Sequence, residues 1–327
     1  MVDAPVTPEL AGLEARPARR QRPLLGYAMV VAAASLWGIN GTFLKVAIQS
    51  GLSTYRLAEV RCAGGAILFF AAAALTRRSG LRLQRQEVPW LLAFGILGLA
   101  FVQFLFFVGI ERLDIGVAIV LQYLSPVWVA LWARFVVKQP ARRRLWYGLA
   151  FALAGLTLVV ELWSGVSLNG VGVGASLLGS FTYAAYILLA ERSLAHGRDV
   201  LSLLAWGFAF ATLFWTFAQP WWSFPAGLFD DDVSLLGRLN EVTVPFWLLV
   251  AWIVVFGTFV PFILMIGALH HLSATRVTVT AMVEPVVGAL VAFAWLGESL
   301  GAGQIAGGLL VLAGVALAQT ARARSPG

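Results

Sequence analysis

The stretch Thr280–Leu317 reads TAMVEPVVGALVAFAWLGESLGAGQIAGGLLVLAGVAL, and it decides the class of fold. It contains two long apolar segments joined by a short break at Gly297–Ser299. About 20 apolar residues are enough for a helix to cross a bilayer. The first segment carries one carboxylate, Glu284, directly before Pro285. An ionisable group at that depth is costly in lipid, so we expect Glu284 to face protein or water.

The rest of the chain has the same apolar character. Of its 327 residues 60% are hydrophobic and only 12% are charged, and the mean hydropathy is +0.85. These values lie outside the range of soluble domains and predict an integral membrane protein with the lipid bilayer as its surroundings. The net charge of +7 would suggest nucleic acid in a soluble protein. Here the arginines form short clusters between apolar segments, so no nucleic-acid partner is expected.

Metal and cofactor chemistry has little support in the sequence. The single cysteine, Cys62, excludes an internal disulfide and any cysteine-based metal cluster. The three histidines lie at segment ends and lack the helical HExxH spacing of a zinc site. We therefore predict neither a metal nor a cofactor.

Ten apolar segments are predicted as transmembrane helices, which makes the fold class an all-α polytopic membrane protein. They fall near residues 26–48, 57–76, 88–110, 115–137, 144–161, 171–190, 200–219, 246–269, 275–296 and 301–320. Residues 1–23, rich in proline, alanine and arginine, are predicted to form a disordered cytoplasmic tail, and residues 321–327 a second tail. A cleaved signal peptide is the alternative for the N-terminus, but the first apolar run is too long and similar segments follow it.

The distribution of lysine and arginine predicts the orientation. Basic residues cluster in the N-terminal tail, in the loops after the second and fourth segments, and in the C-terminal tail. Loops on the other face carry few. Because positive residues favour the cytoplasmic side, both termini are predicted to lie in the cytoplasm and the protein in the cytoplasmic membrane. The longest outer loop, residues 220–245, holds Asp230, Asp231 and Asp232; a solvated acidic loop is favoured over a calcium site because EF-hand spacing is missing.

The chain contains an internal repeat. A shift of 159 residues places Pro285 on Pro126 and Gly314 on Gly155, and a shift of 141 residues aligns residues 34–38 with 175–179. The two halves, residues 24–165 and 166–320, each hold an odd number of predicted helices, so they enter the membrane from opposite sides. Inverted repeats of this kind are typical of secondary transporters, which bind substrate near the midplane. Pro126 and Pro285 are predicted to kink or open their helices.

Several motifs resemble one known family. They are Ala34-Ser35-Leu36-Trp37-Gly38 followed by Lys45, Leu124-Ser125-Pro126, Val283-Glu284-Pro285, and Leu296-Gly297-Glu298 with Gly307–Gly314. Together they resemble the EamA-type transporters of the drug/metabolite transporter superfamily over residues 26–320. The resemblance implies ten helices in two inverted five-helix repeats around a central cavity. It also implies transport of small metabolites, often export of amino acids, without ATP hydrolysis. Gln139 departs from the pattern, because the family often carries a glutamate where the second half has Glu298.

Glu284 is the main candidate for the site. Burial disfavours a charged carboxylate, so Glu284 could bind and release a proton as the coupling ion during transport. The structural alternative is a carboxylate that caps the backbone opened by Pro285 or pairs with a neighbouring helix.

Other polar and aromatic residues inside the segments are candidates for lining a substrate cavity. They are Trp37, Asn40, Gly41, Gln103, Gln122, Tyr123, Tyr183, Tyr186 and Thr280. Each also has an ordinary structural interpretation: interhelical hydrogen bonding for the amides, aromatic packing for the tyrosines, and a bond to its own helix backbone for the threonine.

The remaining charged residues of the segments are assigned outside the site. Lys45, Arg61 and Arg134 are expected to extend toward a membrane surface. Lys45 could pair with Glu59 as an outer gate, and Glu298 is expected to cap the last helix.

The favoured function is a secondary transporter for a small metabolite that alternates access around a midplane cavity. A membrane enzyme is disfavoured because no nucleophile with a base, metal cluster or phosphate cradle is found. A channel, or a receptor or regulatory subunit on the same fold, remains the alternative. The substrate, the direction of transport and the oligomeric state do not follow from the sequence.

Overall fold

The computed structural model describes residues 22–76, 78–113, 115–139, 142–162 and 169–320. The two predicted tails fall outside this part of the chain, apart from Arg22 and Pro23. Most of the linker between the predicted halves, residues 163–168, falls outside it as well.

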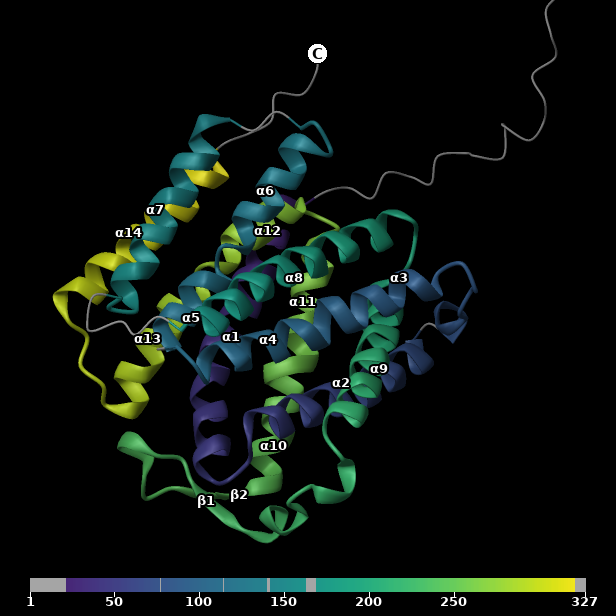
Figure 1. Ribbon diagram of the computed structural model, residues 1–327, viewed down its shortest axis with the longest axis vertical. Helices are drawn as coiled ribbons and strands as arrows, with labels where there is room; N and C mark the ends of the chain where they lie inside the picture. Colours follow the sequence, from purple (N-terminus) through teal and green to yellow (C-terminus); the bar gives the residue numbers. More distant parts are fainter. Residues whose placement is uncertain (1–21, 77, 114, 140–141, 163–168, 321–327) are drawn as a thin grey trace, which may run out of the picture.

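In the described part, nine helical spans are long and apolar enough to cross a membrane. They are α1 (Pro23–Gln49), α2 (Thr54–Thr76), α3 to α4 (Val88–Ile110), α5 to α6 (Gly116–Phe135), α8 (Gly170–Ala195), α9 (Val200–Ala218), α10 to α11 (Phe246–Ala268), α12 to α13 and its extension (Ala274–Leu296), and α14 (Ala302–Gln319). The predicted segment 144–161 corresponds to α7 (Arg143–Val159), whose 17 residues make it shorter than the shortest of these spans. The chain is thus a polytopic, mainly helical membrane protein (Figure 1).

Two spans are broken at equivalent places. The first divides into α5 (Ile115–Gln122) and α6 (Ser125–Phe135), and the second into α12 (Ala274–Ala281) and α13 (Glu284–Val291). In both, a two-residue turn precedes the new helix, and Pro126 or Pro285 occupies its first turn. Proline fits there because the first residues of a helix have no intrahelical acceptor for an N–H group.

Two other spans contain a wider helical turn. A π-helical segment, Ala93–Ala100, separates α3 (Val88–Leu92) from α4 (Phe101–Ile110). A second, Val255–Phe259, separates α10 (Phe246–Val254) from α11 (Val260–Ala268). A third, Ala292–Leu296, extends α13. Such bulges leave backbone groups outside the regular ladder and often occur at functional sites.

Helices α7 and α14 pack backbone to backbone through glycines. A Cβ atom added at Gly148 would lie 2.6 Å from the carbonyl oxygen of Gly314, and one added at Gly155 would lie 2.6 Å from that of Gly307. The reverse contacts, from Gly314 to Gly148 and from Gly307 to Gly155, have the same 2.6 Å. Because residue numbers rise on one helix as they fall on the other, the two helices are antiparallel. A shift of 159 residues also turns one contact into the other, because it takes Gly148 to Gly307 and Gly155 to Gly314.

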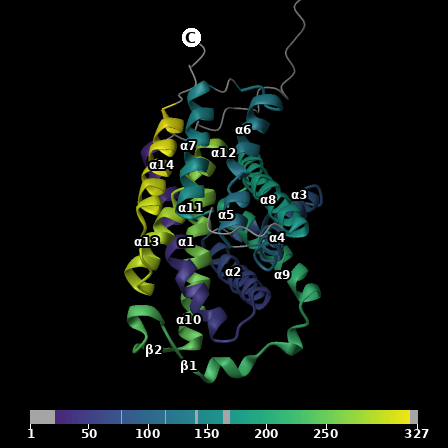
Figure 2. The ribbon, with the colours of Figure 1, turned by 60° about the vertical axis from the view of Figure 1, so that its left-hand side comes forward.

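The other helix contacts follow the same pattern. Helix α1 packs on α11, α12 and α13, and α8 packs correspondingly on α4, α5 and α6. Helix α2 packs on α9, its counterpart by order in the chain. Figures 1 and 2 show α1, α11 and α8 near the middle of the bundle, with α7 and α14 together at one side.

Large apolar side chains cover the outside of the bundle. Leu24 is 84% exposed, Leu75 83% and Phe217 83%. A soluble protein rarely exposes so many large apolar side chains, whereas lipid tails accept them. The interior holds a core of aromatic side chains from α2, the π-helical segment Ala93–Ala100, α8, α9 and α11, with Phe69, Phe94 and Phe208 almost fully buried.

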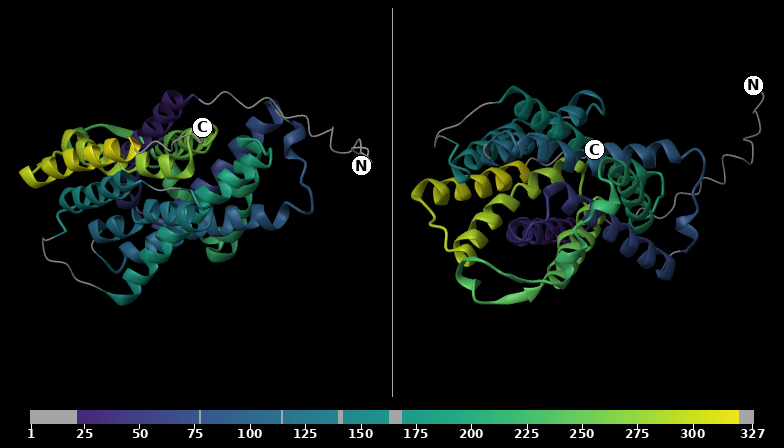
Figure 3. Two further views of the ribbon diagram at one scale, coloured as in Figure 1. Left: turned by 90° about the horizontal axis from the view of Figure 1, so that it is seen from above. Right: turned by 60° about the horizontal axis from the view of Figure 1, so that its bottom comes forward.

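The segment between α9 and α10 adds a feature that the all-α prediction missed. After short 3₁₀ turns, β1 (Asp232–Ser234) pairs antiparallel with β2 (Thr243–Pro245). The hairpin is anchored because Val233 is buried and the Trp295 Nε1–H donates to the Leu235 carbonyl at 2.9 Å. It therefore lies over the end of the α13 span, as the right-hand view of Figure 3 shows.

The first and last described helices meet at the opposite end of the molecule. The Tyr27 hydroxyl near the start of α1 donates to Gln319 Oε1 at the end of α14, at 2.9 Å. In Figure 1 this end is at the top and the hairpin at the bottom.

Candidate functional site

Glu284 stands at the first position of α13, immediately after the helix break, and its side chain is half-buried. Three groups from other spans interact with its carboxyl group. The Tyr123 hydroxyl, from the break between α5 and α6, is placed to donate a hydrogen bond to it, and Tyr183 of α8 and Arg61 of α2 act on it electrostatically. We call Arg61, Tyr123, Tyr183 and Glu284 the Glu284 cluster.

The prediction that Arg61 extends toward a membrane surface is wrong. Its guanidinium group points into the bundle, where Nε donates to the Thr258 hydroxyl at 3.1 Å and Nη2 to the Gly257 carbonyl at 3.2 Å. Both partners belong to the π-helical segment after α10. Arg61 is the eighth residue of α2, about two turns or 10 Å along the helix. That depth is a signal in the sequence that could have placed its side chain inside the bundle.

Around this cluster lie buried polar atoms that lack a hydrogen-bond partner within the described residues. Five belong to candidates named from the sequence: Trp37 Nε1, Asn40 Oδ1, Gln103 Oε1, Gln122 Oε1 and Tyr186 Oη. An unpaired buried polar atom costs about 1–3 kcal/mol, so a protein normally supplies it with a partner. Atoms left in this state within a membrane protein can bind substrate or water.

Aromatic contacts join several of these residues into one surface. The Trp37 ring of α1 lies edge-on to Phe262 of α11, with centroids 5.3 Å apart. Tyr186 meets the same Phe262 ring at 6.0 Å, and Tyr183 lies 5.7 Å from Tyr186. The chain of rings thus connects Trp37 to the Glu284 cluster through Tyr183.

Asn40 and Gln103 approach the cluster from the side of Arg61. Asn40 is buried and its amide lies against Gly257, the residue whose carbonyl accepts from Arg61. Gln103 contacts Cys62, next to Arg61 in the chain, with 3.5 Å between Nε2 and Sγ. The structure therefore gathers residues from both halves of the chain at one place.

Two glycines of α1, Gly38 and Gly41, have contrasting surroundings. A Cβ atom at Gly38 would lie 3.0 Å from the Glu284 carbonyl oxygen and 2.9 Å from the Gly288 nitrogen, so α1 crosses the start of α13 closely. Gly38 was not among the candidates, although it belongs to the motif of residues 34–38. Gly41 is exposed, with open space where a side chain would begin.

Thr280 lies apart from the cluster. Its hydroxyl donates to the Arg276 carbonyl at 2.7 Å and accepts from Gln319 Nε2 at 2.9 Å, in the same group of bonds that includes Tyr27. The break after α12 separates Thr280 from Glu284, so a continuous helical face does not join them.

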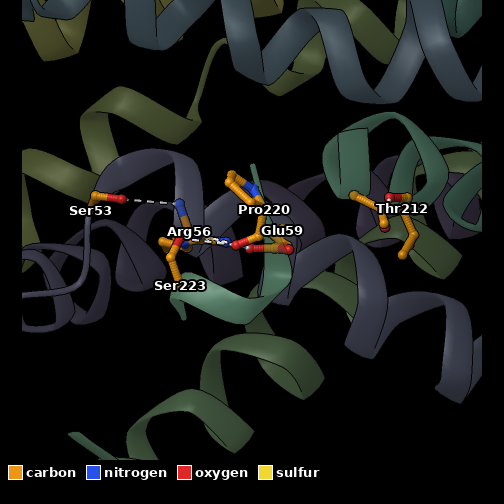
Figure 4. Close-up of polar contacts among 7 residues, drawn as sticks. Ser53, Arg56, Glu59, Thr212, Pro220 and Ser223 are labelled. Carbon is orange, nitrogen blue, oxygen red and sulfur yellow. Dashed lines mark hydrogen bonds and ion pairs between the residues drawn. The ribbon is translucent and has the colours of Figure 1, made fainter. Parts of the chain in front are cut away.

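The expected pair of Lys45 and Glu59 is wrong. Lys45 pairs with Glu298 at 3.0 Å, and both side chains are about half exposed. Glu59 pairs with Arg56 at 2.6 Å, and the Arg56 Nη2 also donates to the Pro220 carbonyl at 2.8 Å (Figure 4). The buried pair thus ties α2 to the segment after α9.

The other two expectations for charged residues have different outcomes. Glu298 does not cap α14, because Gln304 Oε1 accepts from the Gly301 N–H at its N-terminus, at 2.9 Å. Arg134 is exposed at the end of α6, with its guanidinium 5.8 Å from the centre of the Phe135 ring. No group of three or more histidine, cysteine, aspartate or glutamate residues in the described part could hold a metal ion.

The fold and this site define a polytopic membrane protein with polar groups from several spans gathered around one carboxylate. The chain belongs to the EamA-like transporter family, which it matches over residues 24–161 and again over residues 170–320. The family is one of transporters.

Named relatives agree with the family match. The chain is 28% identical over 297 residues to the pseudopaline exporter CntI of Pseudomonas aeruginosa, covering 90% of this chain and 96% of that one. It is 25% identical over 291 residues to a probable amino-acid metabolite efflux pump of Salmonella typhimurium, covering 86% and 90%. It is also 24% identical to the uncharacterized inner membrane transporter YicL of Salmonella typhimurium, covering 89% and 94%. A solved crystal structure superposes with a TM-score of 0.73 at 18% identity, covering 92% of this chain and 99% of that chain.

Proposed function

We propose that this protein is a secondary transporter that exports a small metabolite, an amino acid or a related compound, by alternating access around Glu284. The observation that carries the proposal is the set of unpartnered buried polar atoms on Trp37, Asn40, Gln103, Gln122 and Tyr186. They come from both halves of the chain, and the ring and amide contacts described above link most of them to the Glu284 cluster. A molecule that passes between the halves would meet these atoms on either side.

The proposed architecture is ten transmembrane helices in two inverted repeats, residues 24–165 and 166–320. The equal spacing of the two helix breaks supports it. So do the reciprocal glycine contacts between α7 and α14, because two antiparallel helices with reciprocal contacts are related by a two-fold axis across them. If α7 is added to the nine spans, the chain crosses the membrane ten times and both termini fall on one side. The positive residues favour the cytoplasmic side of the cytoplasmic membrane for the termini.

The helix breaks are the proposed hinges of alternating access. Each leaves carbonyl groups of the preceding helix without their usual intrahelical donors, which can occur in a membrane only where protein or water covers them. Rocking of one half against the other would change the angle at both breaks. Because Glu284 and Tyr123 lie at these two breaks, the same motion would change the surroundings of the carboxyl group.

Proton coupling through Glu284 is part of the proposal. The nearby Tyr123 hydroxyl is neutral, and no cationic nitrogen of the described residues lies within 4.0 Å of the carboxylate. It is therefore free to exchange a proton when access changes. The relatives named as exporters suggest the direction and the kind of substrate.

Counterflow in proteoliposomes tests the function. Purified protein is reconstituted into liposomes loaded with one unlabelled amino acid at a time, and entry of the same labelled amino acid is followed with and without a pH gradient. We expect counterflow for some amino acids and an effect of the gradient. Glu284→Gln should abolish the effect of the gradient, whereas Glu241→Gln, an exposed loop residue, should behave like the wild type.

Two results would contradict the proposal. No counterflow for any amino acid or related metabolite would refute the transporter. An unchanged response to the pH gradient in Glu284→Gln would remove this carboxylate from coupling while leaving transport itself intact.

A further inference from the structure

The charge of Arg61 faces the same site as that of Glu284, and the two do not pair directly. Each acts on the other electrostatically, yet no nitrogen of Arg61 lies within 4.0 Å of a Glu284 carboxylate oxygen. Two opposite charges inside a membrane protein would normally close into an ion pair, because each is costly alone. Because Arg61 and Glu284 stay apart, we infer that other residues hold each charged group in place.

Arg61 is held by the helix opposite. Thr258 and Gly257 accept its Nε and Nη2 protons, and both belong to the π-helical segment, whose backbone carbonyls are not all used within the helix. Its Nη1 makes no hydrogen bond to any described residue. The guanidinium group is thus fixed, with donor capacity left for a further acceptor.

Glu284 is fixed by its place at the start of α13, where α1 packs against its backbone at Gly38, and the Tyr123 hydroxyl lies near its carboxyl group. A hydrogen bond from the Tyr123 hydroxyl would use only part of the carboxylate, whose two oxygens can accept several. A donor on a bound molecule can therefore bind beside Tyr123. An ammonium group supplies such donors together with a compensating charge.

We propose, on the basis of the transport function proposed above, that Arg61 and Glu284 are the two poles of one binding site for a zwitterion. Arg61 takes the carboxylate of the substrate and Glu284 takes its ammonium group. Because ring contacts continue from Tyr183 of the cluster through Tyr186 and Phe262 to Trp37, the substrate presents an apolar or aromatic side chain to this surface. The substrate class is an α-amino acid with a large apolar side chain, or a derivative that keeps both charged groups.

Three ligands that differ in one charge each test the two poles. L-phenylalanine carries both charges, L-phenylalaninamide lacks the carboxylate, and 3-phenylpropionate lacks the ammonium group. Binding is measured at equilibrium by calorimetry on purified full-length protein in detergent. We expect the wild type to bind L-phenylalanine most tightly, because only it satisfies both poles.

The variants should separate the poles. Arg61→Gln should weaken L-phenylalanine and 3-phenylpropionate by roughly 10- to 100-fold and leave L-phenylalaninamide unchanged, since one charge-assisted contact is lost. Glu284→Gln should weaken L-phenylalanine and L-phenylalaninamide by a similar factor and leave 3-phenylpropionate unchanged. Retained binding of the unaffected ligand shows that each variant is folded. Arg134→Gln, which removes an exposed arginine, is the matched control and should change none of the three.

The outcomes distinguish the site from the transport function. If Arg61→Gln weakens all three ligands equally, or none, Arg61 is not the carboxylate pole. If neither L-phenylalanine nor any other large apolar amino acid binds the wild type at millimolar concentration, the zwitterion site is refuted. Binding with the expected pattern but without counterflow would instead refute the transporter. Counterflow that is unaffected in Arg61→Gln would refute the site and leave the transporter.

Discussion

The glycine contact between α7 and α14 allows a quantitative prediction for Gly155→Ala. The added Cβ atom would lie 2.6 Å from both the Gly307 oxygen and the Val311 nitrogen, and 3.0 Å from the Leu310 carbonyl carbon. Favourable contacts of carbon need about 3.5–4.0 Å, so the two backbones must move apart by roughly 1 Å. None of these atoms belongs to a side chain that could rotate away.

The expected cost follows from two opposing effects. Overpacking of a tight contact destabilises by about 1–3 kcal/mol, while replacing glycine by alanine within a helix gains about 0.8–1 kcal/mol. Gly174→Ala in α8 is the matched control, because a Cβ atom there would meet nothing within 4 Å. Gly174→Ala gains the same helix propensity but introduces no clash. The free energy of unfolding of Gly155→Ala should therefore be about 1–3 kcal/mol lower than that of Gly174→Ala.

Thermal unfolding in detergent, followed by tryptophan fluorescence, measures the difference as a shift of a few degrees in Tm. Gly307→Ala should cost as much as Gly155→Ala because their contacts are reciprocal. The double variant should cost less than the sum, since helices already separated accept the second methyl group. Gly155→Ala unfolding at or above the temperature of Gly174→Ala would refute the close backbone contact.

Three further predictions concern other parts of the molecule. Gly41→Phe should reduce transport without lowering Tm, because its side chain enters open space near Trp37; Gly174→Phe, also in open space, should leave transport unchanged, and equal activity of the two variants would place Gly41 outside the pathway. Glu59→Gln should lower the free energy of unfolding by about 3–5 kcal/mol because it leaves Arg56 buried without its partner, whereas Lys45→Gln should cost at most about 1 kcal/mol because its pair with Glu298 is exposed; denaturation that ranks the two in the opposite order would contradict this. Thr280→Val should cost about 1 kcal/mol of stability through the lost bond to Gln319 and leave counterflow intact, and a loss of counterflow at unchanged Tm would return Thr280 to the substrate pathway.

Much of the fold could be predicted because lipid imposes simple conditions on a sequence. A span must be long and apolar, so nine of the predicted segments reappear as spans in the described part of the chain with small changes at their ends. The hairpin of β1 and β2 was missed because short strands outside the membrane are held by local pairing and by one contact with Trp295, not by a periodic pattern.

The site could be predicted only in part. Glu284 stood out because a carboxylate is rare in such a segment, and the amides and tyrosines stood out for the same reason. Arg61 was misassigned because a long cationic side chain can reach either outward or inward from its position. Thr280 was included because a continuous helix would place it beside Glu284, and the break after α12 removes that relation.

The sequence by itself determined the membrane class, the transporter resemblance, the internal repeat and the intramembrane carboxylate of Thr280–Leu317. These depend on composition and spacing, which act locally along the chain. Only the tertiary structure decided which distant groups the charged side chains reach: Arg61 reaches the segment holding Thr258, Lys45 reaches Glu298, and Arg56 reaches the Pro220 carbonyl. The physical reason is that such a pairing depends on the rotation and crossing of whole helices, which backbone contacts such as that of Gly38 with α13 help to set.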